Sequence, residues 1–306
     1  MSQSGLPYHI PALLEETISL LEINPEGTYV DATFGGGGHS RAILEKLGPK
    51  GRLFGFDRDT DALANAPADP RFTFVHSDFR FIQNWMEFYN IKKVDGILAD
   101  LGVSFHHFDT PERGFSFRND APLDMRMNQD GELTAEQLVN TLSEADLTAL
   151  LRQYTDLKNA SAIARAICTR RRSTPIATTG ALAAVVEPLL NKRNIKKELA
   201  QVFQAIRIAT NDEFASLNAL LESSLKLLKK GGRLAILTYH SGEDKIVKDF
   251  MKSGSLKPED DNQALIFGAR KSPLKLITTT PLVASPQEVE ANPRARSAKL
   301  RVAAKA

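Results

Sequence analysis

Short apolar runs alternate with amphipathic segments along the first third of the chain. Four apolar runs are predicted to be strands, at 28–34, 52–57, 72–78 and 94–101. Three amphipathic segments between them are predicted to be helices, at 39–47, 60–65 and 79–89. The runs are apolar at nearly every position, which is typical of strands buried on both faces. This alternation predicts a parallel sheet with helices on both sides.

A different pattern follows Leu101. A loop rich in Asp, Pro and Arg leads into helical spacing from about 134 to 190, where no strand is evident. An amphipathic segment at 198–228 is then predicted to be one long helix. It should end at the lysines and glycines of 229–232, because lysine in the last turn with glycine after it is typical of helix ends. The next apolar run, 233–240, is predicted to be a strand.

The tail adds two further strand predictions, at 274–280 and 297–303, which we expect to pair antiparallel. The whole pattern predicts a discontinuous α/β domain, 1–110 and 198–306, with an all-helical domain, 111–197, inserted into it. The sheet of the larger domain should be mainly parallel and doubly wound.

Composition excludes several classes of protein. The 306 residues are 42% apolar, which suits one large or two smaller globular domains. No apolar run is long enough to cross a membrane and the N-terminus lacks the features of a signal peptide, so we expect a cytoplasmic protein. The single cysteine, Cys168, offers no disulfide framework and is expected to be buried among its apolar neighbours. The sequence says nothing about the oligomeric state.

Charge is distributed unevenly along the chain. The net charge is +2, but the stretch 158–197 contains nine basic residues and one acidic residue. Its clustered members are Arg170, Arg171, Arg172, Lys192, Arg193, Lys196 and Lys197. Such a stretch can face a polyanion. The alternative is an ordinary solvated helical face.

Four consecutive glycines, Gly35 to Gly38, follow the first predicted strand in the segment YVDATFGGGGHS. A glycine run is costly in chain entropy unless the loop needs positive φ or approaches a ligand closely. Dinucleotide-binding and S-adenosylmethionine-binding folds share such a turn. The dinucleotide fingerprint fits poorly, because its sixth position falls on Ser40 or Arg41. A tight structural turn is the alternative.

Aspartates stand at the ends of the predicted strands in this region: Asp31, Asp57, Asp78 and Asp100. Ligands of open α/β sheets bind outside the carboxyl ends of the strands, and buried carboxylates are costly without partners. Asp57 is placed to accept hydrogen bonds from both hydroxyls of an adenosine ribose. Asp78 has an equal alternative as the cap of the following helix.

With these residues in view, the chain resembles the bacterial small-subunit rRNA cytosine-N4 methyltransferase family, known as RsmH or MraW. The matching segments cover nearly the whole chain: YHIPALLEETISLL, YVDATFGGGGHSRAIL, FGFDRDTDAL, DGILADLGVS, RGFSF, PLDMRM, IARAI, FQAIRIATNDEF, GGRLAILTYHSGEDKIVK and NPRARSAKLR. The resemblance implies a Rossmann-like class I methyltransferase with S-adenosylmethionine as methyl donor. It also implies a cytidine in the decoding region of 16S rRNA, within the small ribosomal subunit, as substrate, and the helical insert as the RNA-recognition domain.

The resemblance implies a cofactor site as well. Carried over by position, the site consists of Gly36, Gly37, Gly38, His39, Asp57, Phe79, Asp100 and His107. Three segments depart from the family pattern, one of them SGED at 241–244, where SLED is common. Phe105, His106 and His107 stand where the family usually has Gln, and KELAQ at 197–201 replaces the usual His-Pro-Ala-Thr-Arg.

The implied chemistry needs a proton acceptor, because the lone pair of the exocyclic cytosine amine is delocalised into the ring. A carboxylate that accepts a proton of this amine would favour the tetrahedral nitrogen that attacks the methyl group. Asp100 is the predicted catalytic residue, with cofactor binding alone as its alternative; Ser104 and His240 are secondary candidates. The scattered histidines predict that the chemistry needs no metal.

Two other functional classes are open at this point. One is a nicotinamide-dependent dehydrogenase, which the mismatch to the dinucleotide fingerprint disfavours. The other is a non-catalytic RNA-binding protein that has kept the cofactor fold.

Overall fold

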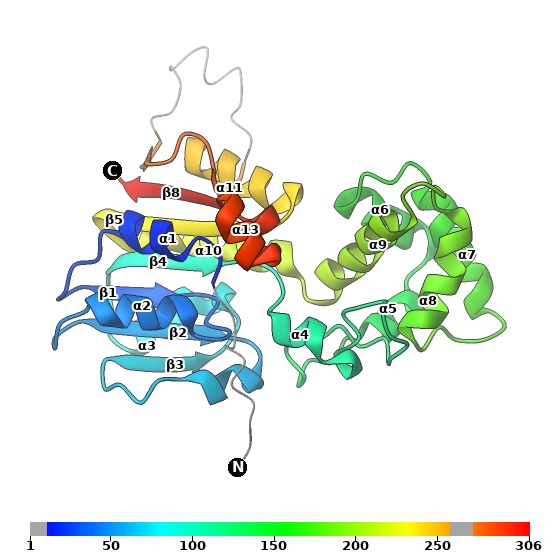
Figure 1. Cartoon of the computed structure of the whole chain (residues 1–306), viewed down its shortest axis with the longest axis horizontal. Helices are drawn as coiled ribbons and strands as arrows, with labels where there is room; N and C mark the ends of the chain where they lie inside the picture. Colours follow the sequence, from blue (N-terminus) through cyan, green and yellow to red (C-terminus); the bar gives the residue numbers. More distant parts are fainter. Residues whose placement is uncertain (1–10, 258–271) are drawn as a thin grey trace. The chain divides into compact units, whose positions relative to one another are not determined.

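The computed structural model describes residues 11–257 and 272–306, which belong to two compact units (Figure 1). The sheet unit contains the chain up to Gly102 and from Ala215 onward, and the helical unit contains Val103–Phe214. The sequence suggests boundaries at 110/111 and 197/198 instead. The second boundary lies later because α9 (Ile195–Thr210) packs its apolar face into the core of the helical unit.

The sheet unit is built on a mostly parallel sheet. Its strands are β1 (Thr28–Asp31), β2 (Arg52–Asp57), β3 (Phe72–His76), β4 (Val94–Asp100), β5 (Leu228–Thr238), β6 (Leu274–Leu276), β7 (Leu282–Val283) and β8 (Lys299–Lys305). The strand order is β3-β2-β1-β4-β5-β8-β6, with β7 paired to β8. The first five of these run parallel, whereas β8 runs antiparallel to β5, β6 and β7. The antiparallel pairing expected in the tail is confirmed by β6 and β8.

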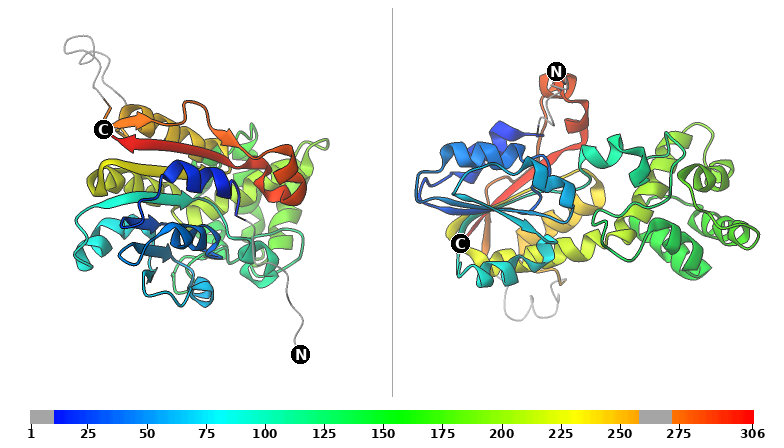
Figure 2. Two further views of the ribbon diagram at one scale, coloured as in Figure 1. Left: turned by 60° about the vertical axis from the view of Figure 1, so that its left-hand side comes forward. Right: turned by 90° about the horizontal axis from the view of Figure 1, so that it is seen from below.

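Helices cover both faces of this sheet (Figure 2). They are α1 (Leu14–Leu21), α2 (Gly38–Lys46), α3 (Ile82–Phe88), α10 (Glu213–Leu227) and α11 (Ser241–Ser253). A further short helix, α13 (Pro286–Ala291), precedes η5 (Pro293–Ser297) and has no buried residue. Val30 and Phe54 share one core cluster with α3, α10 and α11, and the neighbouring Tyr29 and Leu53 share another with α1 and α2. Both sides of each central strand are therefore apolar, and the doubly wound α/β fold is confirmed.

The single long helix expected at 198–228 is wrong. Two helices, α9 and α10, occupy this segment, and Asp212 between them has a left-handed φ of 49°. A continuous helix of L-residues does not tolerate that conformation. The side chain of Asn211 donates to the carbonyls of Arg207 at 3.0 Å and Met125 at 2.7 Å, which fixes the break. The residues expected to end the helix belong to β5, which begins at Leu228.

The helical unit has a core of its own. Its helices are α4 (Phe105–Asp109), α5 (Ala135–Thr141), α6 (Glu144–Tyr154), α7 (Ala160–Arg171), α8 (Thr179–Val186) and α9. Leu147, Ile163, Leu182 and Val202 are buried at its centre. Cys168 is buried there too, as expected. Over 103–214, all described in the structure, no strand is formed.

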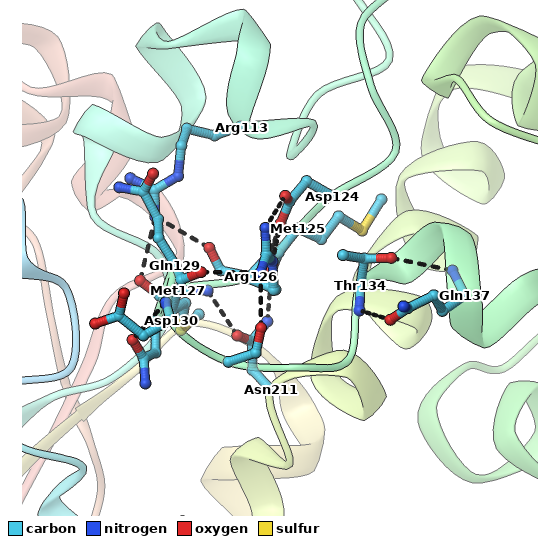
Figure 3. A network of polar contacts seen from close by, with 12 residues as sticks. Arg113, Asp124, Met125, Arg126, Met127, Gln129, Asp130, Thr134, Gln137 and Asn211 are labelled. Carbon is cyan, nitrogen blue, oxygen red and sulfur yellow. Dashed lines mark hydrogen bonds and ion pairs between the residues drawn. The ribbon is translucent and has the colours of Figure 1, made fainter.

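A loop in the helical unit is held by its own arginines (Figure 3). The guanidinium of Arg126 donates to both carboxylate oxygens of Asp124, at 2.8 and 2.7 Å, and to the carbonyls of Gln129 and Gly131. Arg113 donates to the carbonyls of Arg126 at 3.0 Å and Met127 at 3.2 Å. These contacts stabilise the segment that the sequence leaves without regular structure.

Three helices are missing from the sequence predictions. They are α1, α11 and α13, although α1 and α11 are amphipathic. Short 3₁₀ helices lie at η1 (Thr60–Asn65), η2 (Phe79–Phe81), η3 (Pro111–Arg113), η4 (Glu187–Leu189) and η5 (Pro293–Ser297). Across the described part of the chain, no helix combines the length and apolarity that a membrane crossing requires.

Candidate functional site

The predicted aspartates gather at one edge of the sheet. Asp31, Asp57 and Asp100 are the last residues of β1, β2 and β4, and Asp78 follows β3. Because these strands are parallel neighbours, their carboxyl ends lie on the same side. The four carboxylates nevertheless have different hydrogen-bond partners. These partners indicate which aspartates stabilise the fold and which are available to a functional site.

Asp31 serves the fold. Its side chain is buried and accepts hydrogen bonds from the Ser40 hydroxyl at 2.7 Å and from the Thr33 N–H at 3.1 Å. Burial raises the pKa of Asp31 to about 6 despite these donors. Since Ser40 lies in the first turn of α2, this contact fastens the helix to the end of β1.

Asp78 also serves the fold. One carboxylate oxygen accepts from the Arg80 N–H at 2.8 Å and caps η2, which confirms the capping alternative. The other oxygen pairs with Arg58 at 3.0 Å and with Arg80 at 3.1 Å, and accepts from the Ser216 hydroxyl at 2.9 Å. So many partners within the chain leave it no evident ligand role.

Some glycines of the turn are required because a Cβ would collide with neighbouring atoms, whereas another has free space where a Cβ would lie. Gly37 has a φ of 71°, and a Cβ there would lie 2.8 Å from the ring of Phe34. A Cβ at Gly38 would lie 2.2 Å from Pro11. Gly35 has a φ of 50°, but a Cβ there would meet no atom closer than the Thr33 carbonyl at 3.9 Å. Packing thus requires Gly37 and Gly38, whereas Gly35 borders free space.

Asp57 holds this turn against the end of β2. One carboxylate oxygen accepts from the Gly35 N–H at 2.8 Å, and the other accepts from the Asp59 N–H at 2.8 Å. The side chain is only partly buried. Asp57 therefore connects the glycine turn to the residues that follow β2.

Asp100 has a more unusual environment. Its Oδ1 accepts a hydrogen bond of 2.7 Å from the Tyr239 hydroxyl, and its backbone N–H donates to the Thr33 hydroxyl at 2.6 Å. Burial raises the pKa of Asp100 to about 7; the Tyr239 bond opposes this rise, and the charges of Asp31 and Glu243 add to it. The side chain is still 23% exposed. A carboxyl that titrates near neutral pH at a sheet edge is typical of functional sites.

His39 lies beside this carboxylate. Its Nδ1 is 3.8 Å from Oδ2 of Asp100, which is too long for a hydrogen bond. Burial lowers the pKa of His39 to about 4, so the imidazole is neutral at pH 7. Among the described residues, its buried Nε2 has no hydrogen-bond partner. A polar atom in this state is a natural contact for a bound molecule.

The remaining predicted residues fall in different places. Phe79 opens η2 in the sheet unit, with the Arg58 guanidinium 5.6 Å from the centre of its ring. His107 belongs to the helical unit, where its Nδ1 is 3.1 Å from the Ser104 hydroxyl and its ring stacks on Phe115 at 4.7 Å. Phe79 therefore shares the sheet edge with the glycine turn, while Ser104 and His107 form a pair within the other unit.

Sequence reasoning missed Tyr239, the residue that contacts Asp100. It directly follows β5, the parallel neighbour of β4, so the strand-end rule could have found it. His240, proposed as a base, instead caps α11: its Nδ1 accepts from the Glu243 N–H at 3.4 Å, and its Nε2 is 3.1 Å from Oε1 of Glu243. Glu243 in turn accepts from the Tyr239 N–H at 3.0 Å.

The basic stretch 158–197 is split between the two ends of α7. Arg171 is structural, because its guanidinium donates to the carbonyls of Val139 and Leu142, both at 2.6 Å, at the end of α5. The other clustered cations form no ion pair within the described chain: Arg170, Arg172, Lys192, Arg193, Lys196 and Lys197. The first two lie at the C-terminal end of α7. Lys197 lines a surface cavity together with Lys158 and Asn159, which precede the N-terminal end of α7. Twelve residues of helix separate these ends by about 18 Å.

No metal centre is evident at this edge or elsewhere in residues 11–257 and 272–306, where no three His, Cys, Asp or Glu side chains are grouped as ligands. The site consists of carboxylates, a neutral histidine, a tyrosine and a glycine turn.

Comparisons with known proteins give a consistent result. A model of the MraW methylase family matches residues 7–306. A relative from Bacteroides thetaiotaomicron, named ribosomal RNA small subunit methyltransferase H, is 48% identical over 305 residues, which is 100% of each chain. A relative of the same name from Porphyromonas gingivalis is 51% identical over 301 residues, 97% of each chain. The solved rRNA methylase from Streptococcus thermophilus is 11% identical with a TM-score of 0.39, over 95% of this chain and 93% of that one, a likeness too distant to support an inference.

Proposed function

Because the chain belongs to the MraW methylase family, we propose that it transfers a methyl group from S-adenosylmethionine to the N4 amine of a cytidine in the decoding region of 16S rRNA. The name shared by its relatives, ribosomal RNA small subunit methyltransferase H, supports small-subunit rRNA as the substrate. The observation that carries the proposal is Asp100, a carboxyl with a pKa of about 7 at the edge of the sheet.

The sheet edge suits the cofactor. Space is open beside Gly35, and the partly buried carboxylate of Asp57 stands at the end of the adjacent strand β2, where an acid can bind the two ribose hydroxyls. The N-terminus of α2 favours an anion such as the methionine carboxylate. Its second residue, His39, offers a buried Nε2 without a partner in the described chain. The proposed cofactor residues in this unit are Gly36, Gly37, Gly38, His39, Asp57, Phe79 and Asp100. His107 is proposed only from its position, where the family usually has Gln.

The chain's own residues would prepare the acceptor. When bound, the cofactor supplies an electrophilic methyl group on a sulfonium. Asp100 is the proposed proton acceptor for the cytosine amine, since a base works best when its pKa lies near the working pH. A carboxylate that accepts from the amine localises the nitrogen lone pair, which is otherwise spread into the ring.

Cations of the helical unit would hold the RNA. Arg170 and Arg172 lie at the C-terminal end of α7, and Lys197 lines a surface cavity at its N-terminal end; the described residues form no ion pair with these three side chains. Phosphate contacts from such side chains supply affinity without sequence information. An enzyme that acts on one base must also take that base out of its stack.

A binding experiment tests the cofactor class first. S-adenosylmethionine should raise the midpoint of thermal unfolding with the logarithm of its concentration once it exceeds Kd, and NAD should not. A shift with NAD alone would favour the dehydrogenase reading. A shift with S-adenosylmethionine but no methyl transfer to small subunits would favour a non-catalytic RNA-binding protein.

A further inference from the structure

The two oxygens of Asp100 are in different environments. Oδ1 accepts the Tyr239 hydroxyl at 2.7 Å. Oδ2 has His39 Nδ1 at 3.8 Å and no hydrogen-bond donor among the described residues. The side chain is 23% exposed, so a carboxylate oxygen is accessible at an otherwise well-packed edge.

We propose that Tyr239 is a positioning residue for the methyl transfer: its hydroxyl holds Oδ1 of Asp100, and Oδ2 is thereby presented to take a proton from the substrate amine. This inference rests on the proposed function and adds a residue to it. In the transfer, the amine nitrogen forms a bond to the methyl carbon, the carbon–sulfur bond breaks with its electron pair staying on sulfur, and one amine proton passes to Oδ2.

Tyr239 is itself well fixed. It follows β5, whose Leu237 pairs in register with Asp100 of β4. Its backbone N–H donates to Oε2 of Glu243 at 3.0 Å. Its ring packs on the cluster that contains Leu237 and Leu300, and a Cβ at Gly102 would lie only 3.6 Å from it. A phenol held in this way has one orientation to offer, which is what positioning a carboxylate requires.

Toward the carboxylate of Asp100 the Tyr239 hydroxyl acts as a donor. Burial and the neighbouring carboxylates Asp100, Glu243 and Glu288 raise the pKa of Tyr239 well above 10. The phenol therefore keeps its proton throughout the reaction and cannot compete with Asp100 as the base. Its bond to Oδ1 stabilises the ionised form of Asp100 and lowers the pKa of that carboxyl.

The titratable groups near Asp100 are consistent with Asp100 as the base and Tyr239 as its hydrogen-bond donor. The carboxylates of Asp31 on β1 and Glu243 on α11 raise its pKa. His39 on α2 is neutral at pH 7 and adds no charge. Within residues 11–257 and 272–306, Tyr239 is thus the one side chain that donates to the carboxylate of Asp100.

The test is Tyr239→Phe, which keeps the ring and removes only the hydroxyl. We expect the affinity for S-adenosylmethionine to stay within about threefold, and the transfer rate at pH 7 to fall about 10- to 100-fold. Loss of the donor raises the pKa of Asp100, so the acidic limb of the pH–rate profile should move to higher pH. The same rise should appear in the cofactor-free protein when the labelled carboxyl carbon of Asp100 is titrated by NMR.

Tyr29→Phe is the matched control. Tyr29 lies in the same sheet, and its hydroxyl accepts the Asn24 N–H at 2.7 Å, away from Asp100. This variant should leave both the pH profile and the Asp100 titration unchanged. A Tyr239→Phe protein with the parent's profile and the parent's Asp100 titration would overturn the positioning role. Loss of cofactor affinity instead would make Tyr239 a cofactor residue and also overturn it. A parent protein that transfers no methyl group would sink the proposed function, and this inference with it, whatever Tyr239→Phe does.

Discussion

The backbone N–H of Gly35 donates a hydrogen bond of 2.8 Å to Oδ2 of Asp57. This bond joins the turn after β1 to the end of β2, the adjacent strand, on the side where Asp100 also lies. One carboxylate thus shapes the glycine turn and stays partly exposed toward solvent. The proposed cofactor site depends on both properties.

Asp57→Ala should weaken the binding of S-adenosylmethionine. It removes the proposed acceptor of the ribose hydroxyls and the acceptor of the Gly35 N–H. Hydrogen bonds to charged groups contribute about 1.5 to 3 kcal/mol, so affinity should fall roughly 10- to 100-fold by calorimetry.

Asp69→Ala is the control for this change. Asp69 is another aspartate of the sheet unit, but among the described residues its carboxylate accepts only from Arg71, from the backbone N–H at 2.8 Å and from the guanidinium at 2.9 and 2.6 Å. Its removal should leave cofactor affinity unchanged. Equal affinity in Asp57→Ala and the parent would show that Asp57 supports the turn and binds no ligand.

Two glycine substitutions should have opposite signatures. Gly37→Ala forces a Cβ to within 2.8 Å of the Phe34 ring at a φ of 71°, so the main effect should be a lower unfolding midpoint. Gly35→Ala meets no atom closer than 3.9 Å, so it should cost only the left-handed strain of about 1 to 2 kcal/mol. Its larger effect should be on cofactor affinity, because the new Cβ enters free space beside Asp57. Calorimetry measures cofactor affinity and thermal unfolding measures stability for both variants. If the turn is purely structural, the folded fraction of each variant should bind S-adenosylmethionine with the affinity of the parent.

The stability of the protein should depend on pH through Asp100. Its pKa is about 7 in the folded state against 3.8 ordinarily, so between these values the folded chain holds a proton that the unfolded chain has lost. The resulting contribution to stability falls as pH rises through this window. Asp100→Asn escapes the effect and keeps an acceptor for Tyr239. The free energy of unfolding of the variant minus that of the parent, measured by urea titration, should be about 2 to 3 kcal/mol larger at pH 8 than at pH 5. An equal difference at both pH values would show that burial does not perturb this carboxyl.

The arginines at the end of α7 should separate by role. Replacing Arg170 and Arg172 with Ser should leave stability intact, weaken binding to small-subunit RNA and reduce the slope of log affinity against log salt by about two. Arg171→Ser should instead lower the unfolding midpoint, because it removes two bonds to carbonyls at the end of α5. Parent-like RNA affinity and salt slope in the double variant would make these cations a solvated face. The phosphate contacts would then lie toward Lys192 and Lys197.

The parts of the fold that follow from local pattern were predictable. Strands buried on both faces are continuous apolar runs, and β2 has the expected bounds, 52–57. The break at Asp212 was not predictable, because amphipathic spacing continues through it and only the φ of 49° ends the helix. The predicted domain boundary at 197/198 differs from the observed one at 214/215 for a related reason. The spacing of apolar residues in α9 does not indicate which of the two cores its apolar face joins.

The site shows the same limit. Sequence could place Asp57 and Asp100 at strand ends on one side of the sheet, because topology fixes where they lie; their roles stay predictions. The sequence could not distinguish them from Asp31 and Asp78, whose partners Ser40 and Ser216 are set by tertiary packing. Tyr239 was overlooked in favour of the adjacent His240, a residue type more often catalytic, although His240 is engaged by Glu243.

Methyl transfer to purified small ribosomal subunits that lack the modification, with mapping of the modified base, tests the central claim most directly. We predict that the protein and labelled S-adenosylmethionine place one methyl group on the N4 amine of a cytidine in the decoding region of 16S rRNA. Asp100→Asn, which keeps the fold and the Tyr239 contact, should lose this transfer. A methyl group on another atom, on another RNA or on protein would contradict the claim, as would a folded, cofactor-binding protein that transfers none.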